Sequence, residues 1–249
     1  VDVLVLLGTS PVAAAWLGRL AGCRLIHNVD GLEWRRAKWG PLAAGYLRLM
    51  ERLAAATCHD LIADSFAIQR YYQDTHGRRA VYIPYGADLE APAPDDLAVL
   101  RELGLAPRRY LLQICRLEPE NNPLWSIREH ARLETELPLV IVGDAPYSDA
   151  YQAQLRRAAD RRVRFTGRLT GRRLAAVRRN ALLYIHGHEV GGTNPSLLEA
   201  MAAGACIVAV DVVYNRETLA EAGRFATLQP GTLAVQLEEL LADGDLRER

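Results

Sequence analysis

The segment 186–201 joins residue types that can bind an anion. It predicts a strand that runs into a loop with Gly191 and Gly192, followed by a helix whose first residue is Pro195. The first turn of a helix carries unpaired backbone N–H groups and about half a positive charge, and glycine lets the backbone approach a ligand closely. We therefore expect a phosphate group to bind here; a capped helix after an ordinary flexible loop is the alternative.

The predicted helix adds polar groups beside this anion site. Thr193 or Asn194 is expected to cap it, and Ser196 lies in its first turn. Glu199 lies one turn further along, where its carboxylate can accept hydrogen bonds from hydroxyl groups. The segment therefore suits a ligand that carries both phosphate and hydroxyl groups.

Two other groups follow predicted strands in the same half of the chain. Arg116 comes after a strand, and its guanidinium can hold a diphosphate through two oxygens; an ion pair with Glu118 or Glu120 is the alternative. Gly143 and Asp144 also end a strand, where glycine permits a tight turn that a flat ring could enter. For this pair a plain strand-to-helix turn is the alternative.

A further group of polar residues lies in the first half of the chain. His27 and Asp30 stand at the end of a predicted strand, and Glu33, Trp34 and Arg35 follow them closely. Carboxylates accept hydrogen bonds from sugar hydroxyls, and an aromatic ring can stack on a sugar. This mixture suits a sugar; a loop held in place by its own ion pairs is the alternative.

Strands and helices alternate along the whole chain, which predicts parallel α/β sheets. Ser10 with Pro11, and later Ser65, are helix-start signals. Strands are expected at 3–7, 24–29, 60–64, 80–83, 110–115, 137–142, 163–166, 181–186 and 205–210. Helices are expected at 12–20, 41–58, 66–73, 123–133, 149–159, 170–179, 195–203 and 233–241.

The chain divides near residue 90. Residues 90–96 are rich in proline, alanine and aspartate and show no apolar periodicity, which indicates a connection. We assign residues 1–89 to a first Rossmann-like domain, 90–104 to a linker and 105–249 to a second Rossmann-like domain. Ligands bind beyond the carboxyl ends of the strands in open α/β sheets, so two such domains predict a cleft between them.

The composition is that of a folded globular chain. Of its 249 residues, 50% are hydrophobic and 24% are charged, which excludes a disordered tail, a collagen and a disulfide knot. The 30 basic and 30 acidic side chains cancel, so no overall positive field attracts nucleic acid, and no nucleic-acid partner is predicted. Arginines crowd the stretch 161–179, where a solvated surface is favoured over a nucleic-acid patch.

The sequence predicts no disulfide, metal site or membrane span. The 4 cysteines are scattered without a CxxC pair, which indicates free thiols and a cytoplasmic location. His186 and His188 are two residues apart at a strand end, so their side chains point to opposite faces and cannot readily share a metal ion. Apolar runs are all shorter than the roughly 18 residues that a spanning helix needs.

Four segments together resemble the motifs of a known family. Residues 192–204, with the sequence GTNPSLLEAMAAG, resemble the donor-binding motif of the family 4 retaining glycosyltransferases, which have the GT-B fold. They are most similar to the rhamnosyltransferase-like branch that makes bacterial cell-surface polysaccharides. Residues 28–39 resemble the acceptor-domain motif of that branch, 116–122 its phosphate loop and 83–88 its interdomain connection.

The resemblance implies two domains facing a cleft and a retaining, metal-independent transfer of a sugar from a nucleotide-diphosphate donor, with no separate cofactor. Asp30, Arg116 and Glu199 would be catalytic: Arg116 would hold the diphosphate and Glu199 the ribose hydroxyls. His27, Glu33, Trp34 and Arg35 would lie on the acceptor side. The donor would contact Gly143, Asp144, Gly191, Gly192, Thr193, Asn194, Pro195, Ser196 and Glu199.

The chain departs from the family pattern at three places. Asn121 stands where many members have a lysine, Gly191 replaces the first glutamate of the Glu-x7-Glu pair, and Asp30 stands in place of the usual histidine. These departures fit a donor with a 6-deoxy sugar such as rhamnose. Family members are also longer, so we expect a fragment whose first domain is incomplete.

The resemblance further implies a saccharide or lipid-linked acceptor. A lipid-linked acceptor would bring the protein into peripheral contact with the inner face of the membrane. Two other functions stay open at this point: a nucleotide-sugar epimerase with the same fold, and a catalytically silent binding scaffold.

Overall fold

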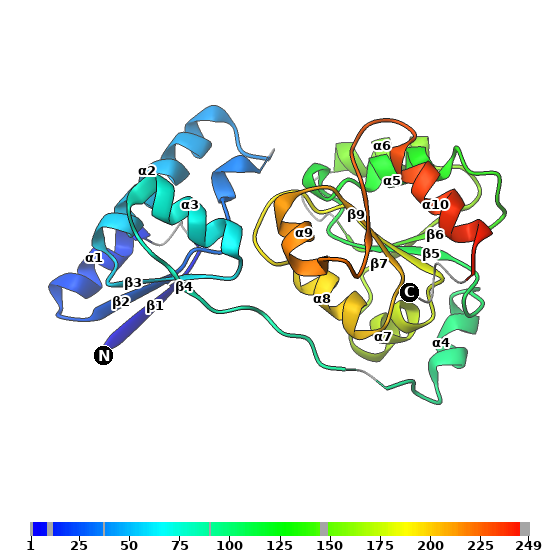
Figure 1. Cartoon of the computed structure of the whole chain (residues 1–249), viewed down its shortest axis with the longest axis horizontal. Helices are drawn as coiled ribbons and strands as arrows, with labels where there is room; N and C mark the ends of the chain where they lie inside the picture. Colours follow the sequence, from blue (N-terminus) through cyan, green and yellow to red (C-terminus); the bar gives the residue numbers. More distant parts are fainter. Residues whose placement is uncertain (1, 9–11, 37, 90, 145–148, 245–249) are drawn as a thin grey trace. The chain divides into compact units, whose positions relative to one another are not determined.

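The computed structural model describes residues 2–8, 12–36, 38–89, 91–144 and 149–244, and these form two compact units (Figure 1). The first unit comprises the chain up to Tyr85 together with the loop Val190–Asn194. The second unit comprises Gly86–Glu189 and the chain from Pro195 onward. Each unit is built around a parallel sheet, which confirms the predicted fold class.

The first unit contains a sheet of four parallel strands in the order β1-β2-β3-β4. Ser65 caps helix α3 as predicted, because its Oγ accepts a hydrogen bond from the backbone N–H of Ile68 at 3.2 Å. Ser10 and Pro11 lie outside the described residues. The elements are β1 (Val3–Leu7), α1 (Val12–Leu20), β2 (Arg24–Asn28), the 3-10 helix η1 (Glu33–Arg35), α2 (Pro41–Thr57), β3 (Asp60–Ala63), α3 (Phe66–His76) and β4 (Val81–Tyr82).

The second unit contains a sheet of six parallel strands in the order β10-β9-β8-β5-β6-β7. Strands β6, β8 and β9 are buried along their whole length, which explains the unbroken apolar sequences of β6 and β9. The strands are β5 (Leu111–Ile114), β6 (Leu139–Val142), β7 (Val163–Gly167), β8 (Leu183–His186), β9 (Ile207–Val210) and β10 (Arg224–Ala226).

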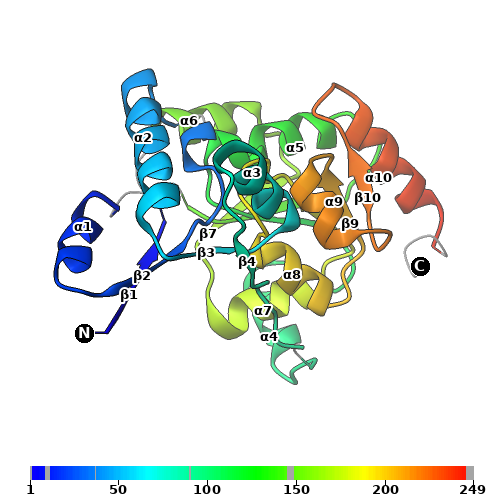
Figure 2. The same ribbon diagram turned by 60° about the vertical axis from the view of Figure 1, so that its left-hand side comes forward.

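Helices cover both faces of this second sheet, as Figures 1 and 2 show. One apolar cluster joins the sheet to α5, α6 and α10, and another joins it to α4, α7, α8 and α9. The elements outside the sheet are α4 (Asp96–Glu102), the 3-10 helix η2 (Pro119–Asn121), α5 (Pro123–His130), α6 (Asp149–Ala158), α7 (Gly171–Arg179), α8 (Pro195–Ala202), α9 (Val213–Leu219) and α10 (Thr232–Ala242).

The structure differs from the sequence-based assignment at the start of the second unit. Residues 96–102, which we placed in the linker, form α4 and pack on α7. Asp96 is 7% exposed and pairs with Arg179, with 2.6 Å between Asp96 Oδ1 and Arg179 Nη2. The partner lies 83 residues away in the sequence, so no local pattern could have placed this helix in the domain. Two short elements near the C-terminal end, α9 and β10, were also not predicted.

Candidate functional site

The strand order of the second sheet marks one place for a ligand. Strand β5 lies at its centre, with β6 on one side and β8 on the other. The chain runs outward from β5 through β6 to β7, then returns to β8 and runs outward in the other direction. In such sheets the loops at the carboxyl ends of the two central strands separate and leave room for a ligand. Arg116 follows β5, and the segment leading to α8 follows β8.

The loops after β5 and β8 are fastened together at this edge. Gln113 Nε2 donates to the carbonyl of Asn121 at 2.8 Å, and Asn122 Nδ2 donates to the carbonyl of Gly187 at 2.9 Å. Gly187 must be glycine, because a Cβ there would lie 2.3 Å from the carbonyl oxygen of Asn121. Asn122 Nδ2 also donates to Oε1 of Glu189 at 2.5 Å. The two loops therefore form one framework beneath the predicted diphosphate site.

Arg116 lies at the surface of this framework. Its side chain is 55% exposed, and Nη1 lies 3.7 Å from Oε2 of Glu118. The ion pair that we gave as the alternative is thus present, but an exposed pair at this distance contributes little to stability. The Arg116 guanidinium can therefore turn to an incoming anion at small cost.

Asn121 has a structural role that the sequence did not suggest. Its side chain is 4% exposed, Nδ2 donates to the carbonyl of Arg116 at 2.8 Å, and Oδ1 lies 2.6 Å from Nδ1 of His188. At the position where the resemblance implied a lysine, this chain has a buried amide that fixes the backbone of the Arg116 loop and connects it to the loop after β8.

Gly143 and Asp144 lie at the neighbouring strand end. A Cβ on Gly143 would lie 1.7 Å from the carbonyl oxygen of Cys115, so the glycine is required by close backbone packing between β5 and β6. Both residues line a cavity of about 120 Å³ together with Leu117 and Phe165. Asp144 is exposed.

Helix α8 begins at Pro195, as predicted. Ser196 lies in its first turn, and the buried Tyr184 on β8 donates to Ser196 Oγ at 3.4 Å. Burial raises the pKa of Tyr184 well above its usual range, so this hydroxyl stays protonated and able to donate. The contact holds the start of α8 against β8.

Glu199 forms an ion pair that was not predicted. Its carboxylate Oε2 accepts a hydrogen bond from Nη1 of Arg178, which lies near the end of α7. The Arg178 side chain is 5% exposed, whereas that of Glu199 is 42% exposed. The sequence showed Arg178 only as one member of the arginine-rich stretch, and no spacing connected it to Glu199.

Five other arginines of that stretch also make intramolecular contacts. Arg161 pairs with Glu136, Arg162 with Asp160 and Arg173 with Glu102. Arg164 donates to the carbonyl of Gly104 at 2.6 Å, and Arg179 pairs with Asp96. These pairs explain the abundance of arginine here by structural contacts within the second unit.

In the first unit, the loop Val190–Asn194 contacts the end of β3. The Thr193 amide donates to Oδ2 of Asp64 at 3.0 Å, and its hydroxyl donates to the Asp64 carbonyl at 2.8 Å. A Cβ on Gly192 would lie 1.8 Å from Oδ1 of Asp64. The amide and the hydroxyl of Thr193, a residue that we expected to contact the donor, therefore both donate to Asp64 in this structure.

Asp64 is a buried acid that the sequence analysis did not single out. Asp64 is 2% exposed, and its Oδ1 has no hydrogen-bond partner among the described residues. Burial, and to a smaller extent the negative charge of Asp30, raises the pKa of Asp64 from 3.8 to about 6. Asp30 itself is exposed and has a φ of 42°, a left-handed conformation that aspartate adopts more readily than most residues with a Cβ.

His27 has a position that does not suit an acceptor site. It is the fourth residue of β2, is 0% exposed, and Nε2 lies 3.0 Å from the carbonyl oxygen of Gly8. Burial lowers its pKa, so the ring is neutral. His27 thus packs within the first unit instead of facing a ligand, because the alternation of side chains along β2 turns it inward.

The residues that follow Asp30 are held by their own contacts, as the alternative interpretation proposed. Glu33 pairs with Arg36 at 2.6 Å and Lys38 at 3.3 Å, and it accepts a hydrogen bond from Trp39 Nε1 at 3.0 Å. These interactions close the loop around η1. Glu33 is therefore engaged within its own loop.

Trp34 is also anchored by neighbouring residues. Its indole N–H donates to the buried Glu51 at 2.8 Å, and the guanidinium carbons of Arg48 and Arg35 lie 4.1 Å and 5.1 Å from its ring centroid. The Trp34 ring faces arginine side chains in this structure. A sugar that stacked on it would have to displace one of them.

The described residues contain no group of three or more histidine, cysteine or acidic side chains placed to hold a metal ion. His186 is 2% exposed. Burial, and to a smaller extent the nearby His188, lowers the pKa of His186 to about 3, so the ring is neutral. Among the described residues, no helix is long and apolar enough to cross a bilayer.

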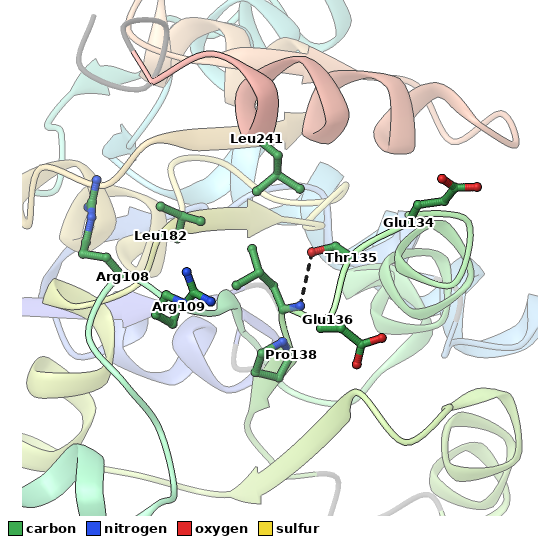
Figure 3. A pocket seen from close by; sticks show the side chains of 9 residues that line it. Arg108, Arg109, Glu134, Thr135, Glu136, Pro138, Leu182 and Leu241 are labelled. Carbon is green, nitrogen blue, oxygen red and sulfur yellow. Dashed lines mark hydrogen bonds between the residues drawn. The ribbon is translucent and has the colours of Figure 1, made fainter.

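A larger cavity, of about 540 Å³, lies at the opposite edge of the second sheet (Figure 3). Its lining comes from residues just before β5, β6 and β8, and from the end of α10. Leu137, Pro138, Leu182 and Leu241 form its apolar part, and Arg108 and Arg109 lie at its side. None of the predicted site residues lines it.

Two α/β units, each built on a parallel sheet, define the GT-B architecture. The chain belongs to the glycosyl transferases group 1 family, whose sequence profile matches residues 108–243, more than half of the chain. Residues 14–88 match a second profile, a domain of unknown function named DUF1972. No curated protein sequence matches the chain.

Solved structures support the same fold. Sucrose-phosphate synthase from Thermosynechococcus elongatus has a TM-score of 0.84 at 17% identity, over 99% of this chain and 66% of its own. Anabaena HepE in complex with UDP-glucose has a TM-score of 0.85 at 20% identity, over 99% of this chain and 71% of its own. Trehalose-phosphate synthase from Burkholderia xenovorans has a TM-score of 0.76 at 16% identity, over 99% and 67%. The chain thus spans about two thirds of these neighbours.

Proposed function

We propose that the chain binds a nucleotide-diphosphate sugar at the carboxyl edge of the second sheet and transfers the sugar to a saccharide or lipid-linked acceptor. The observation that carries this proposal is the meeting of Arg116, α8 and Glu199 with the switch point between β5 and β8, in a member of the glycosyl transferases group 1. HepE, which has a similar fold, was solved with UDP-glucose, and this supports a nucleotide-sugar donor.

Each part of the donor has a matching group at this edge. The exposed Arg116 guanidinium and the positive end of α8 would neutralise the charge that develops on the leaving diphosphate. Glu199 would accept hydrogen bonds from the ribose, and the cavity beside Gly143 and Asp144 would take part of the base. Charge stabilisation by these groups needs no metal ion.

We assign the chain to the retaining, family 4 type, with a 6-deoxyhexose such as rhamnose as the transferred sugar. Gly191 in place of a glutamate and Asp30 in place of a histidine support this assignment, because both changes fall where related enzymes contact the sugar. Asp30 is exposed two residues after the end of β2, and we assign it a contact with the transferred sugar.

An apolar stripe on α2 supports a lipid-linked acceptor and peripheral membrane contact. Leu42, Tyr46, Leu49 and Leu53 recur at helical spacing and are 92%, 48%, 52% and 37% exposed. Arg48 and Arg52 are exposed beside them, and the acid of this helix, Glu51, is buried. An apolar stripe flanked by cations is typical of helices that lie on an anionic membrane surface.

Titration of the 249-residue chain with UDP and with thymidine diphosphate tests the donor site. We expect Arg116→Ala to weaken binding of the preferred nucleotide by about tenfold, the size of a lost charge-assisted hydrogen bond. Arg161→Ala is the matched control, because Arg161 is 79% exposed in the same unit and pairs with Glu136 near the opposite edge. Equal affinity for the wild type and Arg116→Ala would contradict the proposal.

Product analysis separates transfer from the other two functions. Incubation with donor and a polyprenyl-diphosphate-linked sugar is expected to give a longer lipid-linked product. A changed sugar with donor alone would indicate an epimerase. Nucleotide-induced thermal stabilisation without any product would indicate a binding scaffold.

A further inference from the structure

The pair formed by Arg178 and Glu199 connects the core of the second unit to the proposed ribose site. Arg178 lies in α7 and is 5% exposed, so its charge is almost removed from water. Glu199 lies in α8 and is 42% exposed, so its carboxylate reaches the surface. The cation is therefore the fixed member of the pair, and the carboxylate is the member that a ligand can reach.

The hydrogen bond from Arg178 fixes the orientation of the Glu199 carboxylate. A glutamate side chain has several rotatable bonds and samples many orientations when it is exposed. Here Oε2 is held by Nη1 of Arg178, and this is the side-chain hydrogen bond that Glu199 makes among the described residues. With Oε2 held, Oε1 has a defined position at the surface. A carboxylate accepts through both oxygens, so Oε1 can still accept from a ligand hydroxyl.

We infer that Arg178 is a positioning residue that holds Glu199 so that its free oxygen accepts from a ribose hydroxyl of the bound nucleotide. This inference rests on the proposed function, because it takes Glu199 as a ribose ligand. Arg178 does not touch the nucleotide itself. Loss of Arg178 therefore removes the recognition of ribose hydroxyls and leaves the binding of the diphosphate in place.

The neighbouring residue provides a matched control. Arg179 lies in the same helix, its side chain is 10% exposed, and it pairs with the equally buried Asp96 of α4. Replacing either arginine removes an ion pair of the second unit: the pair of Arg178 reaches Glu199 in α8, whereas the pair of Arg179 reaches Asp96 in α4. An effect that comes from general loosening of α7 should therefore appear in both variants.

The experiment is a calorimetric titration of the full chain with UDP and with dideoxyuridine diphosphate, which lacks both ribose hydroxyls. If thymidine diphosphate binds more tightly than UDP, it is compared with its own dideoxy counterpart instead. The wild type is expected to prefer the hydroxylated nucleotide by about tenfold, as one lost charge-assisted hydrogen bond predicts. Arg178→Gln and Glu199→Gln should each abolish that preference, and the double variant should bind the two nucleotides with the same ratio of affinities as either single variant. Arg179→Gln should keep the wild-type preference.

Arg178→Met provides the same test if Arg178→Gln fails to fold, because an apolar side chain is tolerated in a buried position. A wild-type preference retained in the folded Arg178 variant would overturn the inference while leaving the donor site intact. A wild type that binds neither nucleotide would instead overturn the proposed function on which the inference depends. A wild type that binds both nucleotides equally would overturn the assignment of Glu199 to the ribose, and the inference with it.

Discussion

Replacing Glu199 by alanine should destabilise the second unit, and a second change should rescue it. Glu199→Ala leaves the guanidinium of Arg178, in a side chain that is 5% exposed, without this carboxylate. Removing one partner of a fully buried pair costs about 3–5 kcal/mol. Because Glu199 is 42% exposed and water can reach that end of the pair, we expect a smaller loss, about 2 kcal/mol.

Thermal unfolding followed by far-ultraviolet circular dichroism measures this loss. In a chain of this size, about 2 kcal/mol corresponds to a decrease in Tm of roughly 4–8 °C. The double variant Glu199→Ala with Arg178→Met removes the buried charge as well, so its Tm should return to within about 2 °C of the wild type. A double variant no more stable than Glu199→Ala would refute the reasoning, because it would mean that loss of the carboxylate from the Arg178 pair is not the cause of the destabilisation.

Further outcomes follow from other contacts. Asp64 has a pKa raised to about 6, so the folded state holds the carboxyl proton more tightly than the unfolded state. The contribution of the protonated Asp64 to stability therefore falls as the pH rises from about 4 to 6. Asp64→Asn should flatten that part of the plot of Tm against pH. A steeper profile in the variant would contradict this sign. Gly187→Ala should lower the Tm by several degrees, because its Cβ would lie 2.3 Å from a backbone oxygen, and an unchanged Tm would show that the loops are not fastened as described. The double variant Leu42→Glu with Leu49→Glu should no longer sediment with phosphatidylglycerol vesicles. The control Leu97→Glu, at a residue 51% exposed on α4, should sediment like the wild type. Equal sedimentation of the wild type, the double variant and the control would argue against α2 as the membrane surface.

The sequence allowed most of the framework to be predicted because its signals are local. Apolar runs identified β1, β2, β3 and the five longer strands of the second sheet, and Ser65 and Pro195 identified helix starts. The order of the strands is not local, so the switch point between β5 and β8 became visible only in the structure. The edge at which Arg116, Gly143 and α8 meet was expected from strand ends alone.

The contacts that refine the site join residues far apart in the sequence. Arg178 and Glu199 are 21 residues apart, and Thr193 and Asp64 are 129 apart. His27 was assigned to a ligand because it stands near a strand end, but the alternation of β2 turns it inward. Glu33 and Trp34 have the residue types of a sugar site, yet ion pairs and arginine contacts within the first unit engage both. Residue type alone could not distinguish these uses.

The most direct test of the central claim is hydrogen–deuterium exchange of the full chain with and without UDP or thymidine diphosphate. If the diphosphate binds at the carboxyl edge of the second sheet, peptides covering 115–122, 143–144 and 195–199 should become protected. Protection confined to 108–109, 134–138 and 182, which line the cavity at the opposite edge, would contradict the account.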